Sequence, residues 1–456
     1  MGQPTEPTWL SRALRPITEV KPGEAISALL LTANVFLLLT AYYLIKPVRE
    51  SLILAGNSGA EYKSYMSGGI ALLLFGLVPA YGKLVDRLPR IKLVIGVSLA
   101  FGAQLLLFYV AMVLGAEGGL GLALFFYAWV GVFNVMVVAQ FWAYANDIYD
   151  KEQGDRLFPL IALGASIGAA VGSKVANVVI KGLGLKPMLA LAALLLVVCS
   201  ALFYWVERRQ PARPERALEG MPMTKETSDK RLANMPGGFQ LVVRHRYLLL
   251  IALFSLVFNW VNSNSEYMLS KLIKADAAAK AVRDHLAPEH IGDLIGAAYA
   301  DFFFYVNVVG VLLQTFVVSR LVKWLGLSKA FLFLPVISVA NATVVAFLPI
   351  IALVKATKTA ENATDYSLNN TLRQMLWLVT TPQMKYKAKQ VVDTFCVRIG
   401  DFCSALSVLV TVDLLHFSVS RFAWVSIALG GVWIALALAI GKLHRGFEER
   451  GERLEA

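Results

Sequence analysis

Apolar stretches about as long as a bilayer is thick recur along the whole chain, and short polar segments separate them. A membrane-spanning helix needs about 20 consecutive, mainly apolar residues, so this pattern predicts an all-α membrane protein with many spans. Twelve transmembrane helices fit the sequence, at residues 27–55, 62–82, 91–114, 121–147, 157–181, 187–206, 247–272, 295–319, 329–352, 363–382, 390–414 and 419–441.

One long polar stretch, Glu207 to Gly238, interrupts the pattern and is rich in basic residues and prolines. Such a composition is typical of a linker. We therefore expect an N-terminal six-helix half at 1–206, a cytoplasmic linker at 207–246 and a C-terminal six-helix half at 247–456.

The two halves echo each other. Asn134 and Trp142 recur as Asn369 and Trp377, both 235 positions later, which suggests a duplicated unit. Parallel duplicated halves with a site between them are the architecture of the major facilitator transporters. The segment Gly82–Arg90, which reads Gly-Lys-Leu-Val-Asp-Arg-Leu-Pro-Arg, resembles the loop signature G-x-x-x-D-R-x-G-R of that superfamily. In such folds the acid caps a neighbouring helix and the basic residues hold the cytoplasmic gate.

Composition and charge fix the orientation that we expect. Apolar residues make up 57% of the 456 residues, charged residues make up 16%, and the net charge is +12. On the twelve-span map, the loops and span edges on the side of both termini hold 28 Lys and Arg, against 10 on the opposite side. Because basic residues concentrate in cytoplasmic loops, both termini are predicted to be cytoplasmic. The excess of positive charge is thus explained by basic cytoplasmic loops beside a lipid bilayer, and we expect no nucleic acid as a partner.

Charges inside the predicted spans are the candidate functional residues. The basic ones are Lys46, Arg49, Lys174, Arg373 and Arg398, and the acidic ones include Glu50, Asp147, Glu266, Asp365, Asp393 and Asp401. A charge at membrane depth costs about 2.5–3.5 kcal/mol on insertion scales, so it should face a watery cavity, a partner of opposite charge or a ligand. Internal pairing is one interpretation. A bound polyanion is the other, since arginine presents a bidentate fork to phosphate.

The first span concentrates these charges around Pro47, which predicts a kink or a local break. Lys46, Arg49 and Glu50 share one helical face. The second span begins near Tyr62, so the basic pair should lie two to three turns below the outer surface. The alternative is that both side chains snorkel to the interface.

Several classes of function lack their sequence motifs. The chain has no phosphate-binding G-x-x-x-x-G-K-[ST] loop, no catalytic Ser-His-Asp or Cys-His arrangement and no His/Cys metal cluster. We therefore expect no enzyme, metal or cofactor, and we expect a carrier of a small anionic substrate. A non-transporting sensor or a membrane-embedded lipid enzyme is the alternative outside transport.

Span four and the helix after it carry the sharpest motif. Residues Phe141 to Ile148 read Phe-Trp-Ala-Tyr-Ala-Asn-Asp-Ile. This string closely resembles the F-W-x-[FY]-A-N-[DE]-[IV] segment of the ATP/ADP translocase family, the nucleotide transporters of intracellular bacteria and plastids. Gly164, Gly168 and Gly172 follow at a spacing of four, which predicts a close contact between helices.

Further segments resemble the same family: Lys46–Leu52 in span one, Asn262–Glu266 followed by Lys271 in span seven, and Lys385–Asp393 before and into span eleven. The resemblance implies that Arg49, Asp147 and Glu266 take part in nucleotide transport, and we add Lys46, Arg398 and Asp401 as substrate-binding candidates. The chain has Asp401 where the family has a functional lysine, and Asp147 where glutamate is more usual. Arg398 stands three residues before Asp401, close enough on a helix to pair with it.

The resemblance implies alternating-access transport of ATP and ADP, or of a related phosphorylated nucleotide, by an integral protein of a bacterial inner membrane. The alternative within transport is a carrier of another organic anion, coupled to protons through Asp147 or Glu266. Four aromatic residues of the spans could stack on a base, although aromatic residues in spans more often pack or form interface belts. They are Tyr42, Tyr43, Trp142 and Tyr144.

Overall fold

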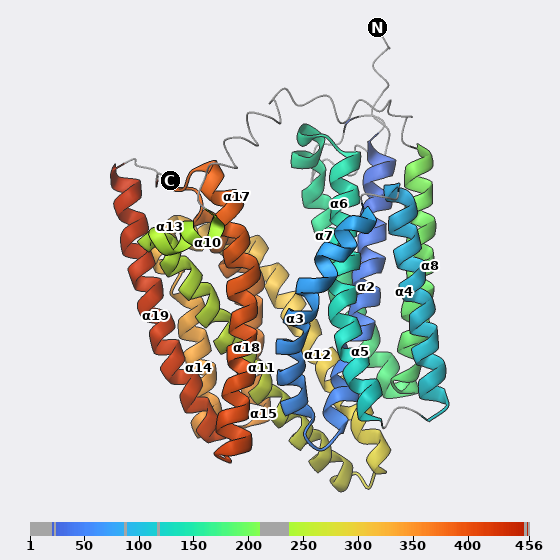
Figure 1. Ribbon diagram of the computed structural model, residues 1–456. Helices are drawn as coiled ribbons and strands as arrows, with labels where there is room; N and C mark the ends of the chain where they lie inside the picture. The colour runs from blue at the N-terminus through green and yellow to red at the C-terminus, as the bar shows by residue number, and fades with distance from the viewer. Residues whose placement is uncertain are drawn as a thin grey trace. The chain divides into compact units, whose positions relative to one another are not determined.

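The computed structural model describes residues 21, 24–85, 89–115, 119–209, 237–450 and 454, and nearly all of them are helical (Figure 1). Among these residues, nine stretches are long and apolar enough to cross a membrane. They are Ala25–Ala55, Arg90–Val113, Leu120–Ile148, Glu152–Leu183, Lys186–Arg209, Arg246–Arg283, Pro288–Ala330, Lys387–Leu414 and Val419–Phe447. The chain is therefore a multi-pass, all-helical membrane protein, and the count of twelve spans stays a prediction.

The helices group into two compact units, each described here by itself. Unit 1 comprises Met1–Asn57, Leu73–Pro214 and Ala281–Asn307. Its helices are α2 (Ala25–Ala55), the later part of α3 (Gly59–Val85), α4 (Arg90–Val113), α5 (Leu120–Phe133), the π-helical η2 (Asn134–Val138), α6 (Ala139–Ile148), α7 (Lys151–Leu183), α8 (Lys186–Arg209), the 3₁₀ turn η4 (Pro288–His290) and most of α12 (Ile291–Leu312).

Unit 2 comprises Ser58–Leu72, Glu215–Lys280 and Val308–Ala456. It holds the first part of α3, then α10 (Gly238–Arg244), α11 (Arg246–Arg283), η5 (Leu313–Val317), α13 (Val318–Ala330), α14 (Phe333–Phe347), α15 (Ile351–Thr364), η6 (Asp365–Asn369), α16 (Asn370–Met375), α17 (Pro382–Gln390), η7 (Val391–Cys396), α18 (Val397–Val408), η8 (Leu409–Leu414) and α19 (Val419–Arg450). The predicted division into halves at residues 206 and 247 stays a prediction. Residues 210–236 of its linker lie outside the described residues.

Unit 1 is assembled on the close contact between α2 and α7. A Cβ atom added to Gly172 would lie 2.7 Å from the backbone oxygen of Thr40, so only glycine allows this approach. Thr40 in turn donates its hydroxyl to the carbonyl oxygen of Gly168 at 3.2 Å. The three glycines Gly164, Gly168 and Gly172 meet the backbone at Thr32, Phe36 and Thr40, respectively. The predicted glycine contact is confirmed.

The α2 helix runs through Pro47 without a break to Ala55, and α3 begins at Gly59. The predicted position of the first turn is therefore confirmed. Of the kink or local break predicted at Pro47, the break is wrong, and the kink stays a prediction. The proline lies within a long helix whose other residues keep it continuous.

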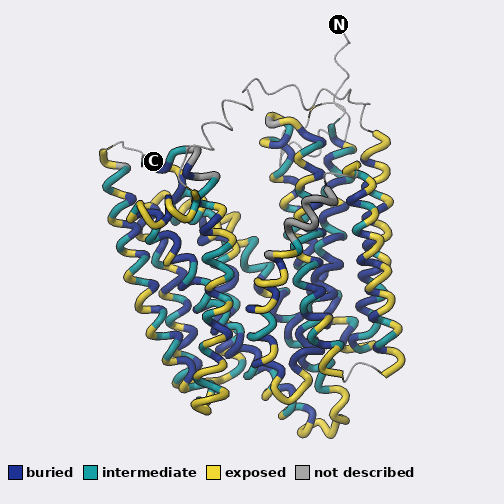
Figure 2. Tube along the Cα trace, viewed as in Figure 1, coloured by how far each residue is buried: buried dark blue, intermediate teal, exposed yellow. Residues whose placement is uncertain are grey.

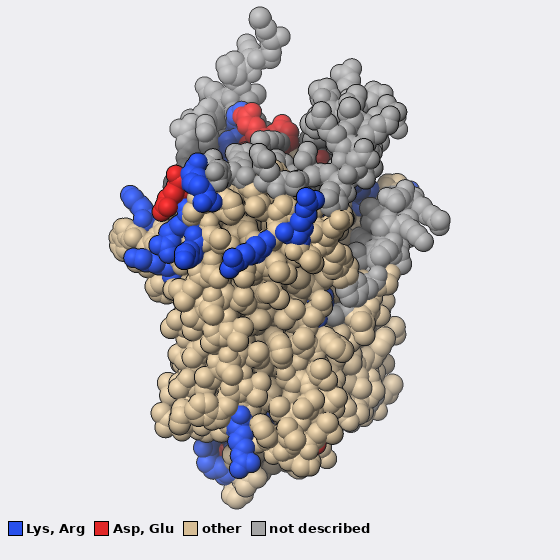
Figure 3. Space-filling view, turned by 60° about the vertical axis from the view of Figure 1, so that its left-hand side comes forward, with Lys and Arg blue, Asp and Glu red and all other residues tan. Residues whose placement is uncertain are grey.

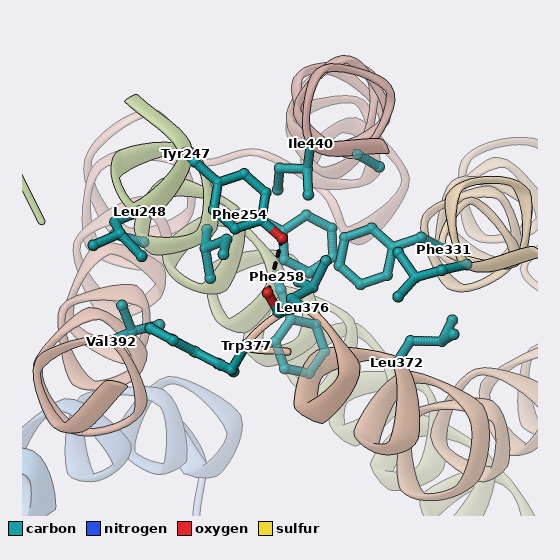
Figure 4. Packing of buried hydrophobic residues seen from close by; sticks show 14 of the residues in the cluster. Tyr247, Leu248, Phe254, Phe258, Phe331, Leu372, Leu376, Trp377, Val392 and Ile440 are labelled. Atoms are coloured by element: carbon teal, nitrogen blue, oxygen red, sulfur yellow. Dashed lines mark hydrogen bonds between the residues drawn. The ribbon is translucent and has the colours of Figure 1, made fainter. Parts of the chain in front are cut away.

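Unit 2 has an aromatic core in which helices from distant parts of its sequence meet (Figure 4). Phe254 of α11 stacks on Phe331 with ring centroids 4.3 Å apart. Tyr247, also on α11, donates its hydroxyl to the carbonyl oxygen of Leu376 at 2.9 Å, shown as the dashed line in Figure 4. The buried phenol thus satisfies its polar group without water.

Exposure along the helices follows the pattern of a lipid-facing surface. On α8 the buried positions recur at helical spacing (Figure 2), while its exposed face still carries apolar side chains such as Leu194, Val197 and Trp205. On the face drawn in Figure 3, the described Lys and Arg gather at the two ends, and a broad belt between them is almost entirely uncharged. Both features fit helices immersed in a bilayer.

The structure corrects the predicted map at two places. The predicted outer loop between residues 352 and 363 is helical and forms most of α15 (Ile351–Thr364). The helix α11 continues to Arg283, beyond the predicted end of span seven at residue 272. Both segments contain charged residues that lower hydropathy, so the predicted spans leave them out. The alanines and alternating charges of residues 274–293 do favour a short surface helix there, and residues 274–283 continue α11.

Candidate functional site

Two consecutive phenylalanines of α12, Phe303 and Phe304, each contact the ammonium of a lysine from another helix of unit 1. The ammonium of Lys46 lies 4.0 Å from the ring centroid of Phe303 and 5.3 Å from that of Tyr43. The ammonium of Lys174 on α7 lies 5.2 Å from the ring centroid of Phe304. An aromatic face stabilises a cation by about 0.5–2 kcal/mol without cancelling its charge. Each of the two lysines is thus held against an aromatic face of α12.

Arg49 lies one turn beyond Lys46 on α2 and pairs with the carboxylate next to it. Its Nε atom donates to Oε1 of Glu50 at 3.0 Å, and its Nη2 atom contacts the same oxygen. The guanidinium also lies over the ring of Tyr127 of α5, 4.7 Å from the centroid. The Glu50 side chain is 1% exposed and that of Arg49 is 14% exposed. Arg49 is thus the accessible member of a buried ion pair.

Asp147 is placed at the end of α6, where it forms an ion pair with Arg90 at the start of α4. The two residues line the end of a cavity of about 410 Å³ in unit 1. The rest of the cavity wall is mostly apolar, from Leu74, Leu77, Leu93, Val94, Val135, Met136, Ala139 and Ala143, with Gln140, Tyr144 and Asn146 as polar members. The wall of this cavity therefore contains an ion pair, that of Arg90 and Asp147.

The four candidate base-stacking residues pack against other aromatic side chains of unit 1. Tyr42 stacks on Phe133 at 6.2 Å, and Tyr144 meets Phe203 edge-on at 5.1 Å. Tyr144 also donates its hydroxyl to Glu207 at 2.8 Å. Trp142 contacts the neighbouring Phe141, and Tyr43 contacts Phe303. These contacts favour the packing interpretation.

Arg398 and Asp401 lie in unit 2 and form the predicted pair. Nη1 of Arg398 lies 3.4 Å from Oδ2 of Asp401. The other carboxylate oxygen accepts hydrogen bonds from Nδ2 of Asn259 at 2.7 Å and from the hydroxyl of Ser263 at 2.8 Å, both on α11. The Asp401 side chain is 13% exposed, whereas that of Arg398 is 31% exposed. Asp401 therefore fixes and partly neutralises an arginine that remains accessible.

Glu266, on α11 in unit 2, lies between two lysines. Its carboxylate oxygens are 3.6 Å from the ammonium of Lys63 on α3 and 3.7 Å from that of Lys358 on α15. Oε1 of Glu266 also accepts a hydrogen bond from Nδ2 of Asn362 at 3.1 Å. The carboxylate thus lies near two cations from two different helices.

Lys358 and its partner Glu361 were missed by sequence reasoning. The predicted loop that contained them is buried helix, and the Lys358 side chain is fully buried. The available signal was the spacing of the two residues, i and i+3, within a run of alanine and threonine that suits close packing.

Two other charged residues of the predicted spans, Arg373 and Asp393, form an ion pair. Arg373 donates to Asp393 at 2.9 Å in unit 2. The six predicted site residues therefore do not form one cluster within a unit. Lys46, Arg49 and Asp147 belong to unit 1, and Glu266, Arg398 and Asp401 belong to unit 2.

Comparison with known proteins establishes the family. The sequence profile of the Major Facilitator Superfamily matches residues 25–272, which is more than half of the chain. The chain belongs to the Major Facilitator Superfamily. The predicted resemblance to this superfamily is thus confirmed. In its loop signature, residues 86–88 lie outside the described residues, and Arg90 makes the ion pair with Asp147.

A superfamily relative that matches this chain is "ADP,ATP carrier protein 1" of Chlamydia pneumoniae. The two sequences are 22% identical over 346 residues, which cover 68% of this chain. The match spans 65% of the length of that curated relative. The predicted resemblance to the ATP/ADP translocase family is therefore confirmed at the level of sequence.

Solved transporter structures share the fold. The nucleoside transporter NupG is similar with a TM-score of 0.61 and 14% identity, over 91% of this chain and 98% of NupG. A bacterial homologue of the iron transporter ferroportin, in an inward-facing state, has a TM-score of 0.62 and 14% identity over the same shares of the two chains. At such identities the likeness concerns the fold alone. Together with the match to the family profile and to the carrier from Chlamydia pneumoniae, it supports a membrane transporter of the major facilitator type.

Proposed function

We propose that this protein is a secondary active transporter that moves phosphorylated nucleotides across the membrane by alternating access, with exchange of ATP-type and ADP-type nucleotides as the expected mode. The observation that carries the proposal is the state of Lys46 and Arg49 in α2. One cation rests on aromatic rings, and the other pairs with a single carboxylate. In this proposal a phosphate binds these two cations, which lie one helical turn apart on α2.

Phosphate suits these two groups for a physical reason. An arginine whose Nε and Nη2 share one carboxylate oxygen can offer its remaining N–H groups to a second anion. A lysine over an aromatic ring has lost part of its hydration but none of its charge. A dianionic or more highly charged phosphate would therefore gain more from the site than a singly charged organic acid.

Two further facts support the nucleotide as substrate. The relative from Chlamydia pneumoniae is named as an ADP,ATP carrier. The segments that match the translocase motifs also supply Arg49, Asp147 and Glu266, which are all held in ion pairs. The excess of basic residues on the side of the termini supports an orientation with both termini in the cytoplasm of a bacterial cell.

The proposal is tested first by ligand binding to the purified protein. A ligand at 100 times its Kd stabilises the folded state by about 2.7 kcal/mol, which raises the unfolding temperature measurably. ATP, ADP, AMP, nucleosides, inorganic phosphate and dicarboxylates should be compared at matched ionic strength. We expect the phosphorylated nucleotides to raise the unfolding temperature and the nucleosides to have little effect.

Uptake into proteoliposomes completes the test. Labelled ADP should enter vesicles loaded with ATP faster than empty vesicles, because exchange needs a counter-substrate inside. Uptake into empty vesicles that depends on a proton gradient would instead identify a proton-coupled carrier. If nucleotides neither stabilise the protein nor enter the vesicles, while another organic anion does both, the nucleotide proposal is wrong.

A further inference from the structure

The strongest polar feature that the proposed site leaves unexplained is the contact between α11 and α15 in unit 2. Each helix offers three polar residues at positions i, i+3 and i+4, which places them on one face. On α11 they are Asn262, Ser265 and Glu266, and on α15 they are Lys358, Glu361 and Asn362.

Each polar residue of one face bonds to a residue of the other. The ammonium of Lys358 donates to Oδ1 of Asn262 at 3.0 Å, and the hydroxyl of Ser265 donates to Oε2 of Glu361 at 2.9 Å. The third bond runs from Nδ2 of Asn362 to Glu266 at 3.1 Å. The two faces are therefore complementary in donors and acceptors as well as in spacing.

Lys358 and Glu361 are buried far more deeply than Glu266. Their side chains are 0% and 3% exposed, respectively, while the Glu266 side chain is 26% exposed. Glu361 lies 3.3 Å from the ammonium of Lys358 and also accepts hydrogen bonds from Ser338 at 2.8 Å and from Asn341 at 3.1 Å. A substrate can reach Glu266, whereas Lys358 and Glu361 are shielded behind it.

The distances show which contacts of the two lysines are hydrogen bonds and which are longer electrostatic contacts. Lys358 makes its short bond to Asn262, and Lys63 makes its short bond to the hydroxyl of Ser270 at 2.9 Å. Glu266 lies 3.6–3.7 Å from both lysines, beyond ordinary hydrogen-bond length. The lysines therefore act on Glu266 mainly through charge, and Asn362 fixes its carboxylate in place.

Pairing explains why Lys358 and Glu361 occur together. A lysine buried to this extent is stable only if it is paired, and a carboxylate oxygen of Glu361 lies 3.3 Å from its ammonium. Glu361 thereby holds Lys358 beside Glu266.

We propose that Lys358 and Glu361 are positioning residues for transport: Lys358 acts on the carboxylate of Glu266 through its charge, and Glu361 holds Lys358 in place beside that carboxylate. This inference rests on the proposed function for the role of Glu266 in transport, but the coupling of the three residues can be measured without any substrate. The residues act through Glu266 and do not touch the substrate themselves.

The test uses Lys358→Met, Glu361→Gln and the double variant, each with Glu266 intact and with Glu266→Gln. Either single change leaves a buried charge without its partner, so both should lower the unfolding temperature. The double variant restores the balance between these two residues and should recover most of that loss. Lys280→Met, on an exposed lysine of α11, is the matched control and should change neither stability nor uptake.

Uptake of labelled ADP at several concentrations then separates positioning from a merely structural role. We expect the folded double variant to have a maximal rate about tenfold lower, or a KM about tenfold higher, than the wild type. A tenfold change corresponds to about 1.4 kcal/mol, the size of one such interaction. Adding Glu266→Gln to it should cause little further loss, because all three changes act on one group. A folded double variant with wild-type uptake, or losses that multiply with Glu266→Gln, would overturn the proposal.

If the wild type does not take up ADP at all, that failure of uptake counts against the proposed function and not against the positioning role. The positioning role is then decided by unfolding temperatures, since it requires Glu266→Gln to change the cost of Lys358→Met. Equal costs of Lys358→Met in the two backgrounds would show that Lys358 does not act on Glu266.

Discussion

Replacing Asp401 by asparagine should shift substrate preference towards more highly charged nucleotides. Asp401→Asn keeps the size of the side chain and an oxygen that can still accept from Asn259 and Ser263. It removes the negative charge that lies 3.4 Å from the guanidinium of Arg398. A bound phosphate would then no longer compete with a carboxylate for this arginine.

The magnitude follows from the geometry of the pair. Coulomb's law at 3.4 Å gives about 5 kcal/mol for an effective dielectric constant of 20. Because Arg398 is 31% exposed, hydration compensates most of that energy, and partly exposed pairs contribute about 1 kcal/mol in practice. Since about 1.4 kcal/mol corresponds to a factor of ten in affinity, the ratio of ATP affinity to AMP affinity should rise about fivefold.

Competition against labelled ADP in proteoliposomes measures this ratio. The four proteins of the cycle are the wild type, Asp401→Asn, Arg398→Gln and the double variant. The gain from Asp401→Asn should shrink when Arg398 is absent, because the two residues are coupled. Asp393→Asn, which removes the partner of Arg373 in a similar pair, is the control and should leave the ratio unchanged. A folded Asp401→Asn protein with the wild-type ratio would refute the reasoning and place this pair outside the substrate path.

Three further predictions concern unit 1. Arg49→Ala should weaken nucleotide binding at least about tenfold. Arg49→Lys should restore only part of the affinity, because an ammonium lacks the planar fork of a guanidinium. Thermal shift with ADP measures both variants, and full recovery by lysine would contradict the prediction. Gly168→Val should lower the unfolding temperature strongly, since any Cβ at this position clashes with the backbone of Phe36, whereas Gly182→Val, with open space around it, should not. Burial alone would raise the pKa of the Glu24 carboxyl, but hydrogen bonds, led by those from Arg156, hold that pKa below its ordinary value of 4.5. The stabilising effect of the Glu24 carboxylate should be complete above pH 4.5 and decline below it. If the unfolding temperature of Glu24→Gln falls with acid as steeply as that of the wild type, the pair of Glu24 and Arg156 does not contribute to stability.

The sequence was sufficient for features that depend on local spacing. The glycines of α7 predicted a close contact with another helix, because three small residues at intervals of four favour close approach, and the structure identifies that helix as α2. Arg398 and Asp401 could be paired in advance because residues three apart on a helix are neighbours. In both cases the information lies within a few turns of one helix.

The partner of Glu266 could not be found in this way. Lys358 and Glu361 lie in the segment Lys-Ala-Thr-Lys-Thr-Ala-Glu-Asn, whose hydropathy is that of a surface loop. Their burial depends on the polar face of α11, nearly 100 residues earlier in the chain, which satisfies each of their charges. A hydropathy scale assigns each charged residue an unfavourable transfer free energy, and it does not include the partner that compensates the charge in the folded protein.

The same reasoning explains why a transporter would keep its charges in pairs within each unit. Arg49 with Glu50 belongs to unit 1 alone, while Arg398 with Asp401 and Lys358 with Glu361 belong to unit 2 alone. On the proposed alternating-access mechanism, a pair carried within one unit stays intact when that unit moves, which avoids the cost of an uncompensated charge in lipid. The accessible member of the first two pairs is the arginine, and its carboxylate is the more buried partner. The anionic substrate of the proposed function would therefore meet arginines that are already oriented, and it would need only to add to, or to displace, a single carboxylate in order to bind.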